Sequence, residues 1–166
     1  MTLLLLLACT SPPARETVVL VVLDTLRADA IGADTPVFSA FAAEGIRYER
    51  AWSAAPWTFP SHASLFTGLP ERDSGCSSAR LQCDGSQPMV AESFHAAGYA
   101  TAGFSNNPWV SAETGLAAGF DAFVEVFRDN YGVDRAVSRF VDRDSTCLTD
   151  AGAGRTVAAV EACLEH

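Results

Sequence analysis

The sequence lacks the features that mark several classes of protein. It has no basic stripe or cluster, since 11 Lys and Arg stand against 20 Asp and Glu, for a formal net charge of −9. Nothing in it would neutralise a run of phosphates, which excludes a nucleic-acid-binding protein. Low-complexity tracts, internal repeats and apolar runs of the roughly 20 residues that span a bilayer are also missing. What remains is a 166-residue chain that is 49% hydrophobic, as expected of one globular domain.

Cysteines are few, five in all, and no CxxC pair or nearby histidine favours a zinc site. Setting aside Cys9 leaves four, and an even number suits an oxidising compartment. Cys76 and Cys83 flank a short polar loop, so we expect a disulfide there, with Cys147 and Cys163 as a second pair. Four ordinary thiols are the alternative.

The N-terminus begins with five leucines after Met1–Thr2 and continues into Ala8–Cys9. A short apolar run that ends in a small residue indicates an export signal, although no positive residue precedes it here. The ending Leu6–Cys9 also resembles a bacterial lipobox, in which Cys9 would carry a lipid. We therefore predict a leader over residues 1–16 and an exported protein, either periplasmic or attached to the membrane through lipidated Cys9. A misassigned start codon is the alternative.

Residues 17–166 alternate between strand and helix patterns. Thr17–Leu23 is a continuous, largely β-branched apolar run, which predicts a strand buried on both faces of a parallel sheet. Further strands are expected at 46–52, 99–105 and 120–127, and helices at 35–45, 61–68, 89–97, 134–142 and 152–166. This alternation predicts an α/β domain whose mostly parallel sheet is flanked by helices. The chain stops inside the last helical pattern, so we expect 17–166 to be the N-terminal part of a longer domain.

Asp24 directly follows the first predicted strand. Ligands gather at the carboxyl ends of parallel strands, and a carboxylate there suits a hard divalent cation. The alternative is that Asp24 only caps the next turn.

Thr58 stands two residues before Pro60, and a proline fits the first turn of a helix. Thr58 is therefore expected at a helix start, where the dipole and unpaired N–H groups favour an anion. A hydroxyl so placed becomes a nucleophile when a nearby metal ion favours its ionised form. An ordinary N-cap threonine is the alternative.

Together these segments resemble the N-terminal signature of the sulfatase family. The resemblance rests on Val18–Asp29 (VVLVVLDTLRAD), Thr35–Pro36, Ala55–Leu69 (APWTFPSHASLFTGL) and Gly103–Gly119 (GFSNNPWVSAETGLAAG). It implies an alkaline-phosphatase-like α/β fold, a divalent metal ion (Ca, Mg, Mn or Zn) and hydrolysis or transfer at a small anionic sulfate or phosphate ester.

The resemblance also assigns roles to particular residues. Asp24 matches the first metal-binding aspartate, and Thr58 takes the nucleophile position, which also contacts the metal. Threonine cannot be converted to formylglycine, and Thr25 and His62 stand where many sulfatases have a second aspartate and an arginine. These departures are similar to the phospho-transfer and phosphodiesterase branches of the superfamily and make an ordinary arylsulfatase a poor match.

Three other positions leave alternatives open. His62 is a candidate to bind the substrate's oxygens or to protonate a leaving group, or it is a helix residue satisfied by a neighbour. His95 lies in an apolar helix and is interpreted as structural. Asn106 and Asn107 follow a predicted strand end, from which a side chain can reach the site.

The sequence therefore predicts a metal-dependent hydrolase or transferase of sulfate or phosphate esters, with Thr58 and His62 as catalytic residues and Asp24 and Thr58 as metal ligands. The family's downstream ligands find no convincing match in 166 residues. The alternative is a catalytically inactive, secreted α/β module that binds or supports other molecules.

Overall fold

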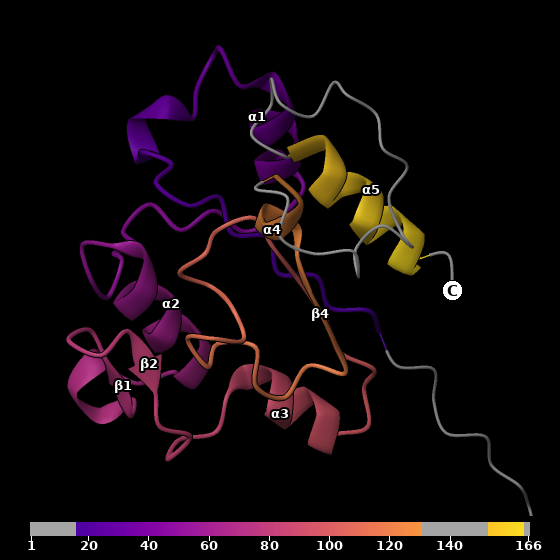
Figure 1. The fold of residues 1–166 in the computed structure, drawn as a ribbon. Coiled ribbons are helices and arrows are strands. Elements are labelled where there is room, and N and C mark those ends of the chain that lie inside the picture. Colours follow the sequence, from indigo (N-terminus) through magenta and orange to yellow (C-terminus); the bar gives the residue numbers. More distant parts are fainter. Residues whose placement is uncertain (1–15, 131–152, 165–166) are drawn as a thin grey trace, which may run out of the picture.

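The computed structural model describes residues 16–130 and 153–164 (Figure 1). The elements in chain order are η1 (Ala28–Ala30), α1 (Pro36–Ala43), α2 (Thr58–Thr67), η2 (Glu71–Asp73), β1 (Cys76–Ser77), β2 (Gln82–Cys83), α3 (Val90–Ala96), β3 (Ala102–Ser105), β4 (Ala122–Glu125), α4 (Val126–Asn130) and α5 (Ala153–Leu164). The predicted leader, apart from Glu16, and the predicted helix at 134–142 lie outside the described residues. Within them, no helix is both long and apolar enough to cross a membrane.

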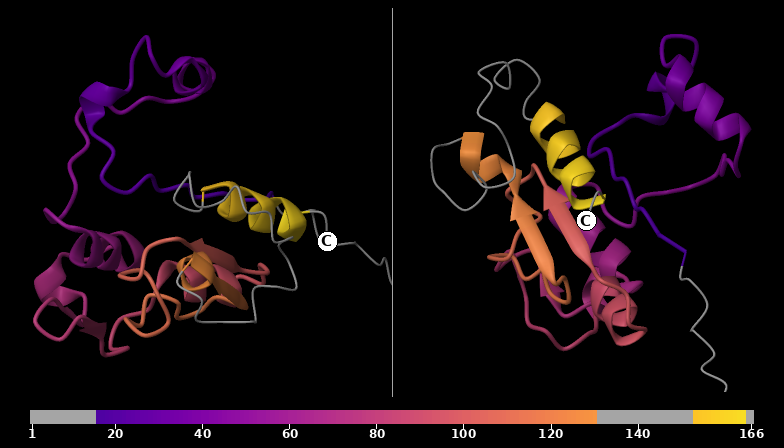
Figure 2. Two further views of the ribbon diagram at one scale, coloured as in Figure 1. Left: turned by 45° about the horizontal axis from the view of Figure 1, so that its top comes forward. Right: turned by 90° about the vertical axis from the view of Figure 1, so that its right-hand side faces the viewer.

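A parallel pair of strands, β3 and β4, forms the centre of the domain. Their register runs from Ala102 opposite Ala122 to Ser105 opposite Glu125. Helix α5 packs on β3, and α4 continues directly from the end of β4 (Figures 1 and 2). The remaining sheet is a short antiparallel hairpin of β1 and β2. Helices packed around a parallel pair confirm the predicted α/β class.

The predicted strands at 17–23 and 46–52 are wrong: neither segment belongs to a strand in the structure. The side chains of the first segment are exposed, with Val21 73% accessible. A strand of a parallel sheet needs a neighbouring strand to pair with and layers that cover both faces of the sheet, and no described strand pairs with this segment. Figure 2 shows that α1 likewise stands away from the body of the molecule, and none of its residues is buried.

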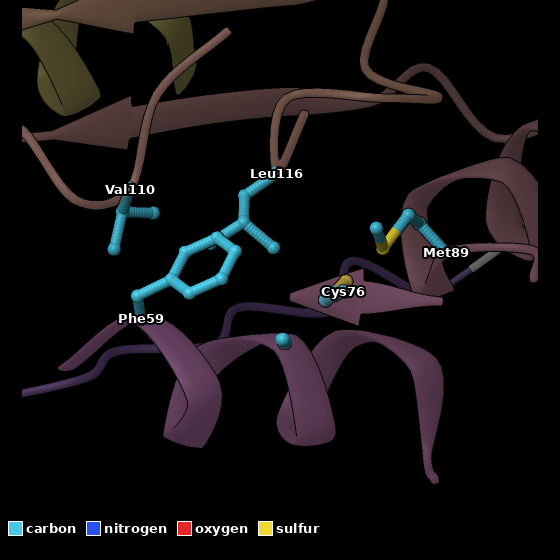
Figure 3. Close-up of a cluster of buried hydrophobic side chains, with 6 residues drawn as sticks. Phe59, Cys76, Met89, Val110 and Leu116 are labelled. Carbon is cyan, nitrogen blue, oxygen red and sulfur yellow. The ribbon is translucent and has the colours of Figure 1, made fainter. Parts of the chain in front are cut away.

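The hydrophobic core packs α2 against the β1–β2 hairpin and the loop between β3 and β4. Phe59 is fully buried and lies against Val110 and Leu116, with Cys76 and Met89 on the far side of the cluster (Figure 3). These residues come from α2, the β1–β2 hairpin, the N-cap of α3 and the loop between β3 and β4, so the core fixes α2 relative to that loop.

The predicted disulfide between Cys76 and Cys83 is present and closes the β1–β2 hairpin. Cys76 is only 5% exposed and belongs to the core, so the crosslink ties the hairpin to the same cluster as Phe59. Cys163, on α5, is an exposed free thiol. The predicted pairing of Cys163 with Cys147 is therefore not borne out, and Cys147 itself lies outside the described residues.

Candidate active site

Thr58 is the first residue of α2. Trp57 before it is extended (φ −148°, ψ 168°), Pro60 follows within the first turn, and Gly68 ends the helix in the left-handed region at φ 70°. Because Phe59 is buried in the core, its half-buried neighbour Thr58 is held at a fixed place. The helix start predicted from Pro60 is thus observed.

The structure brings Asp24 and Thr58 together. The Thr58 hydroxyl, Oγ1, donates a hydrogen bond of 2.8 Å to Asp24 Oδ2, although 34 residues separate the two. Asp24 itself is exposed and lies where the apolar run 17–23 enters a turn. This contact places a carboxylate oxygen directly beside the candidate nucleophile.

The turn after Asp24 is strained. Thr25 has φ 62°, in the left-handed region that is rare for any residue with a side chain and most unfavourable for a β-branched one. Such outliers cluster at functional sites because the surrounding structure must hold them there. This backbone conformation therefore independently marks the neighbourhood of Asp24.

A third side chain joins the pair. Asn107 Nδ2 donates a hydrogen bond of 2.7 Å to the same Asp24 oxygen, Oδ2. Asn107 lies two residues after β3, at the carboxyl end of the parallel pair, where functional groups of α/β proteins collect. The sequence predicted that Asn107 could reach the site from a strand end, and the structure places its side chain against Asp24. The sequence did not indicate which residue Asn107 would contact.

Two tryptophans lie beside these residues. Trp57 precedes Thr58, Trp109 follows Asn107 by two positions, and their rings meet edge to face at 6.1 Å between centroids. Both rings are partly exposed, at 38% and 42%. The contact joins the segment that carries Thr58 to the loop that carries Asn107.

His62 lies one helical turn after Thr58 and is buried, with 8% of its surface exposed. Its Nδ1 lies 2.9 Å from the Thr58 carbonyl oxygen, and since a carbonyl can only accept, Nδ1 carries the hydrogen. Its ring also meets Phe66 edge to face. These contacts match the interpretation of His62 as a helix residue satisfied by a neighbour. His95 instead pairs with Asp121 at 2.9 Å, on another part of the surface.

The oxygen atoms of Asp24 and Thr58 are of the type that binds a hard cation, but two residues supply only part of a ligand set. A carboxylate and a hydroxyl are oxygen ligands of the type that Ca²⁺ and Mg²⁺ take, usually about six at a time. Within the part of the chain that the structure describes, no group of three or more His, Cys, Asp or Glu residues is placed to hold a metal ion. Asp24 and Thr58 therefore fit as part of a ligand set.

Comparison with known protein families identifies a match over most of the chain. The family model described as Sulfatase matches residues 16–144, a range that includes Asp24, Thr58 and Asn107. No curated protein and no solved structure matches significantly.

Proposed function

The chain belongs to the sulfatase family, and from this premise we propose that it cleaves sulfate or phosphate esters with Thr58 as the nucleophile. Family membership gives the coarser assignment, an α/β hydrolase domain of the alkaline-phosphatase-like superfamily. The observation that carries the finer proposal is the 2.8 Å hydrogen bond from Thr58 Oγ1 to Asp24 Oδ2. It selects one hydroxyl, at a helix start, and points its proton at a carboxylate.

In the proposed reaction, Asp24 holds the Thr58 proton at Oδ2 and leaves the lone pairs of Oγ1 directed away from it. As Oγ1 attacks the sulfur or phosphorus atom, its proton passes to Asp24 Oδ2 and the bond to the ester oxygen breaks. That oxygen leaves with the electron pair and takes a proton from solvent, to which Asp24 releases the one it accepted. Water then cleaves the Thr58 ester and releases sulfate or phosphate. The N-terminal end of α2 favours the negative charge of the bound ester.

We propose that Asp24 and Thr58 also contribute ligands to a divalent metal ion. A bound cation supplies positive charge that favours the ionised hydroxyl and offsets the charge of the ester oxygens. The oxygen chemistry of the two side chains supports this role. Ca, Mg, Mn and Zn are all candidates, and two ligands do not select among them.

The identity of the nucleophile favours phosphate over sulfate. Threonine cannot yield the formylglycine aldehyde that ordinary sulfatases use, so the ester must be attacked by the hydroxyl itself. The His62 side chain stabilises the first turn of α2, which carries this hydroxyl, through its hydrogen bond to the Thr58 carbonyl. We therefore propose a small phosphate monoester or diester as the substrate class.

The test compares wild type with Thr58→Ala and the matched control Thr58→Ser, which keeps a hydroxyl. p-Nitrophenyl phosphate, bis(p-nitrophenyl) phosphate and p-nitrophenyl sulfate serve as probes, each with Ca²⁺, Mg²⁺, Mn²⁺ or Zn²⁺ added. We expect turnover of a phosphate probe by wild type, partial retention in Thr58→Ser and at least a 10³-fold loss (order of magnitude) in Thr58→Ala. Turnover by Thr58→Ala at the wild-type rate would show that another group is the nucleophile. Absence of turnover under every condition would favour the inactive binding module.

Export is proposed on separate grounds. The Cys76–Cys83 disulfide is a crosslink typical of oxidising compartments, and it supports an exported or periplasmic protein. We further propose that Cys9 is lipidated and holds the protein at a membrane. Fractionation of cells that express wild type or Cys9→Ser tests this: the wild type should sediment with membranes and the variant should not, and equal distribution of both would exclude the lipid anchor.

A further inference from the structure

We propose that Asn107 is a positioning residue, whose side-chain amide holds the Asp24 carboxylate against the Thr58 hydroxyl. The contact that points to it is the 2.7 Å hydrogen bond from Asn107 Nδ2 to Asp24 Oδ2. The catalytic part of this inference rests on the proposed function, whereas the hydrogen bond itself can be tested without turnover.

The orientation of the Asn107 amide is determined at both ends. Its Oδ1 accepts a hydrogen bond of 2.9 Å from the backbone N–H of Trp109, so the oxygen faces its own loop and the NH₂ group faces Asp24. A flipped amide would set Oδ1 against the Asp24 carboxylate and Nδ2 against the Trp109 N–H, which loses both bonds. Only a side chain with an acceptor and a donor at this spacing satisfies both partners.

The backbone of Asn107 is also fixed. Its carbonyl accepts bonds from the Ser105 hydroxyl at 3.0 Å and from the Val110 N–H at 2.9 Å. Its own N–H donates to Ser105 Oγ at 3.2 Å. Ser105 and Val110 are both buried, the latter in the hydrophobic core. The backbone that carries the amide is therefore held by hydrogen bonds to buried residues.

Asp24 needs such a partner because its own segment is weakly held. Residues 16–30 are all exposed, and the neighbouring apolar run belongs to no strand. The hydrogen bonds that reach the Asp24 carboxylate within the described chain come from Thr58 and Asn107. Both reach Oδ2, so Asn107 fixes which oxygen faces the hydroxyl and leaves Oδ1 directed elsewhere. A carboxylate held by Thr58 alone would rotate and share its oxygens with water.

The informative substitution is Asn107→Asp. It preserves the shape of the side chain and the acceptor for the Trp109 N–H, but it removes the donor and places a like charge beside Asp24. We expect kcat to fall about 10- to 100-fold on the ester that wild type turns over, as for other groups that orient a metal- or substrate-binding side chain. KM should change less than about threefold, since the substituted group orients Asp24 and does not itself bind the ester. A purely structural role in the loop predicts wild-type kcat for Asn107→Asp, and that result would overturn the proposal.

A second measurement does not depend on activity. In ¹⁵N-labelled protein without added metal, the side-chain NH₂ signals of Asn107 are identified by their loss in Asn107→Asp. Asp24→Ala should shift these signals and accelerate their exchange with water. The matched control is Asp29→Ala, which removes a carboxylate from the same segment that pairs with Arg27, and it should leave them in place. Signals that do not respond to Asp24→Ala would exclude the contact. If this contact is found but wild type turns over no ester, the proposed function fails and the positioning contact stands.

Discussion

Thr25 shows, at the scale of single residues, how strain accompanies the site. A left-handed conformation costs a residue with a side chain roughly 1–2 kcal/mol, and Thr25 adopts it beside Asp24. The resemblance to sulfatases also puts a second metal-binding aspartate at this position. Aspartate tolerates the left-handed region much better than threonine does.

We therefore predict that Thr25→Asp binds Ca²⁺ about tenfold more tightly than wild type, because a second carboxylate joins Asp24. Isothermal titration with Ca²⁺ measures this change. Thr25→Asn is the control, since it relieves the same backbone strain without adding charge. Equal Ca²⁺ affinity of the two variants would show that position 25 does not face the cation.

Residues of the site differed in how far the sequence could predict them. Thr58 was accessible because a helix-start proline is a local signal, whereas Asp24 was selected from a strand end that the structure does not contain. The structure nevertheless brings Thr58 Oγ1 within 2.8 Å of Asp24 Oδ2. Asn107 was accessible as a strand-end residue within reach of the site, but its contact with Asp24 was not, because that contact spans 83 residues and depends on how the loop after β3 folds back. For His62 the sequence left two interpretations open, and its contact with its own helix matches one of them.

Elements followed the same division between local and distant causes. Helices α1, α2 and α3 lie within or beside the predicted ranges, since proline near a first turn and glycine after a last turn act locally. The strands expected at 17–23 and 46–52 were wrong. A strand exists only with a paired neighbour, and apolar composition alone does not state whether that neighbour is present.

A polar contact lies at the amino-terminal end of the parallel pair. Asp121 Oδ2 accepts hydrogen bonds from the Thr101 N–H at 2.8 Å and from the Thr101 hydroxyl at 3.0 Å. These bonds, together with His95, hold the pKa of the Asp121 carboxyl below its usual 3.8. The folded state therefore favours the ionised form more than the unfolded state does.

It follows that this contribution to stability is complete above pH 3.8 and is lost as the pH falls through the lower, folded-state pKa. We predict that the melting temperature of wild type falls more steeply on acidification in this range than that of Asp121→Asn, which has no charge to lose there. Thermal melts on both sides of pH 3.8 measure the difference. Parallel acid profiles of the two proteins would show that Asp121 is not responsible. Asp34→Asn, which removes an exposed carboxyl elsewhere on the chain, serves as a control for general charge loss.

On the scale of the whole molecule, the site is assembled from two unequal parts. Thr58 directly precedes the core residue Phe59, and the Asn107 carbonyl accepts a hydrogen bond from the N–H of the core residue Val110. Asp24, by contrast, comes from an exposed segment. The geometry of the site therefore depends on the stability of the core. The Cys76–Cys83 crosslink lies within that core.

We predict that the double variant Cys76→Ala/Cys83→Ala is less stable than wild type by about 2 kcal/mol. The disulfide links residues seven apart, and the loss of unfolded-chain entropy for so short a loop is of this size. For a domain of this length the melting temperature should fall by roughly 5 °C, measured by scanning calorimetry.

Reductant should lower the melting temperature of wild type similarly and leave the double variant unchanged. Cys163→Ala removes only the free thiol of α5, so it should melt as wild type does and keep its response to reductant. Turnover of the double variant below its melting temperature should stay near the wild-type value, since α2 remains anchored by Phe59. A double variant as stable as wild type would show that the hairpin needs no crosslink.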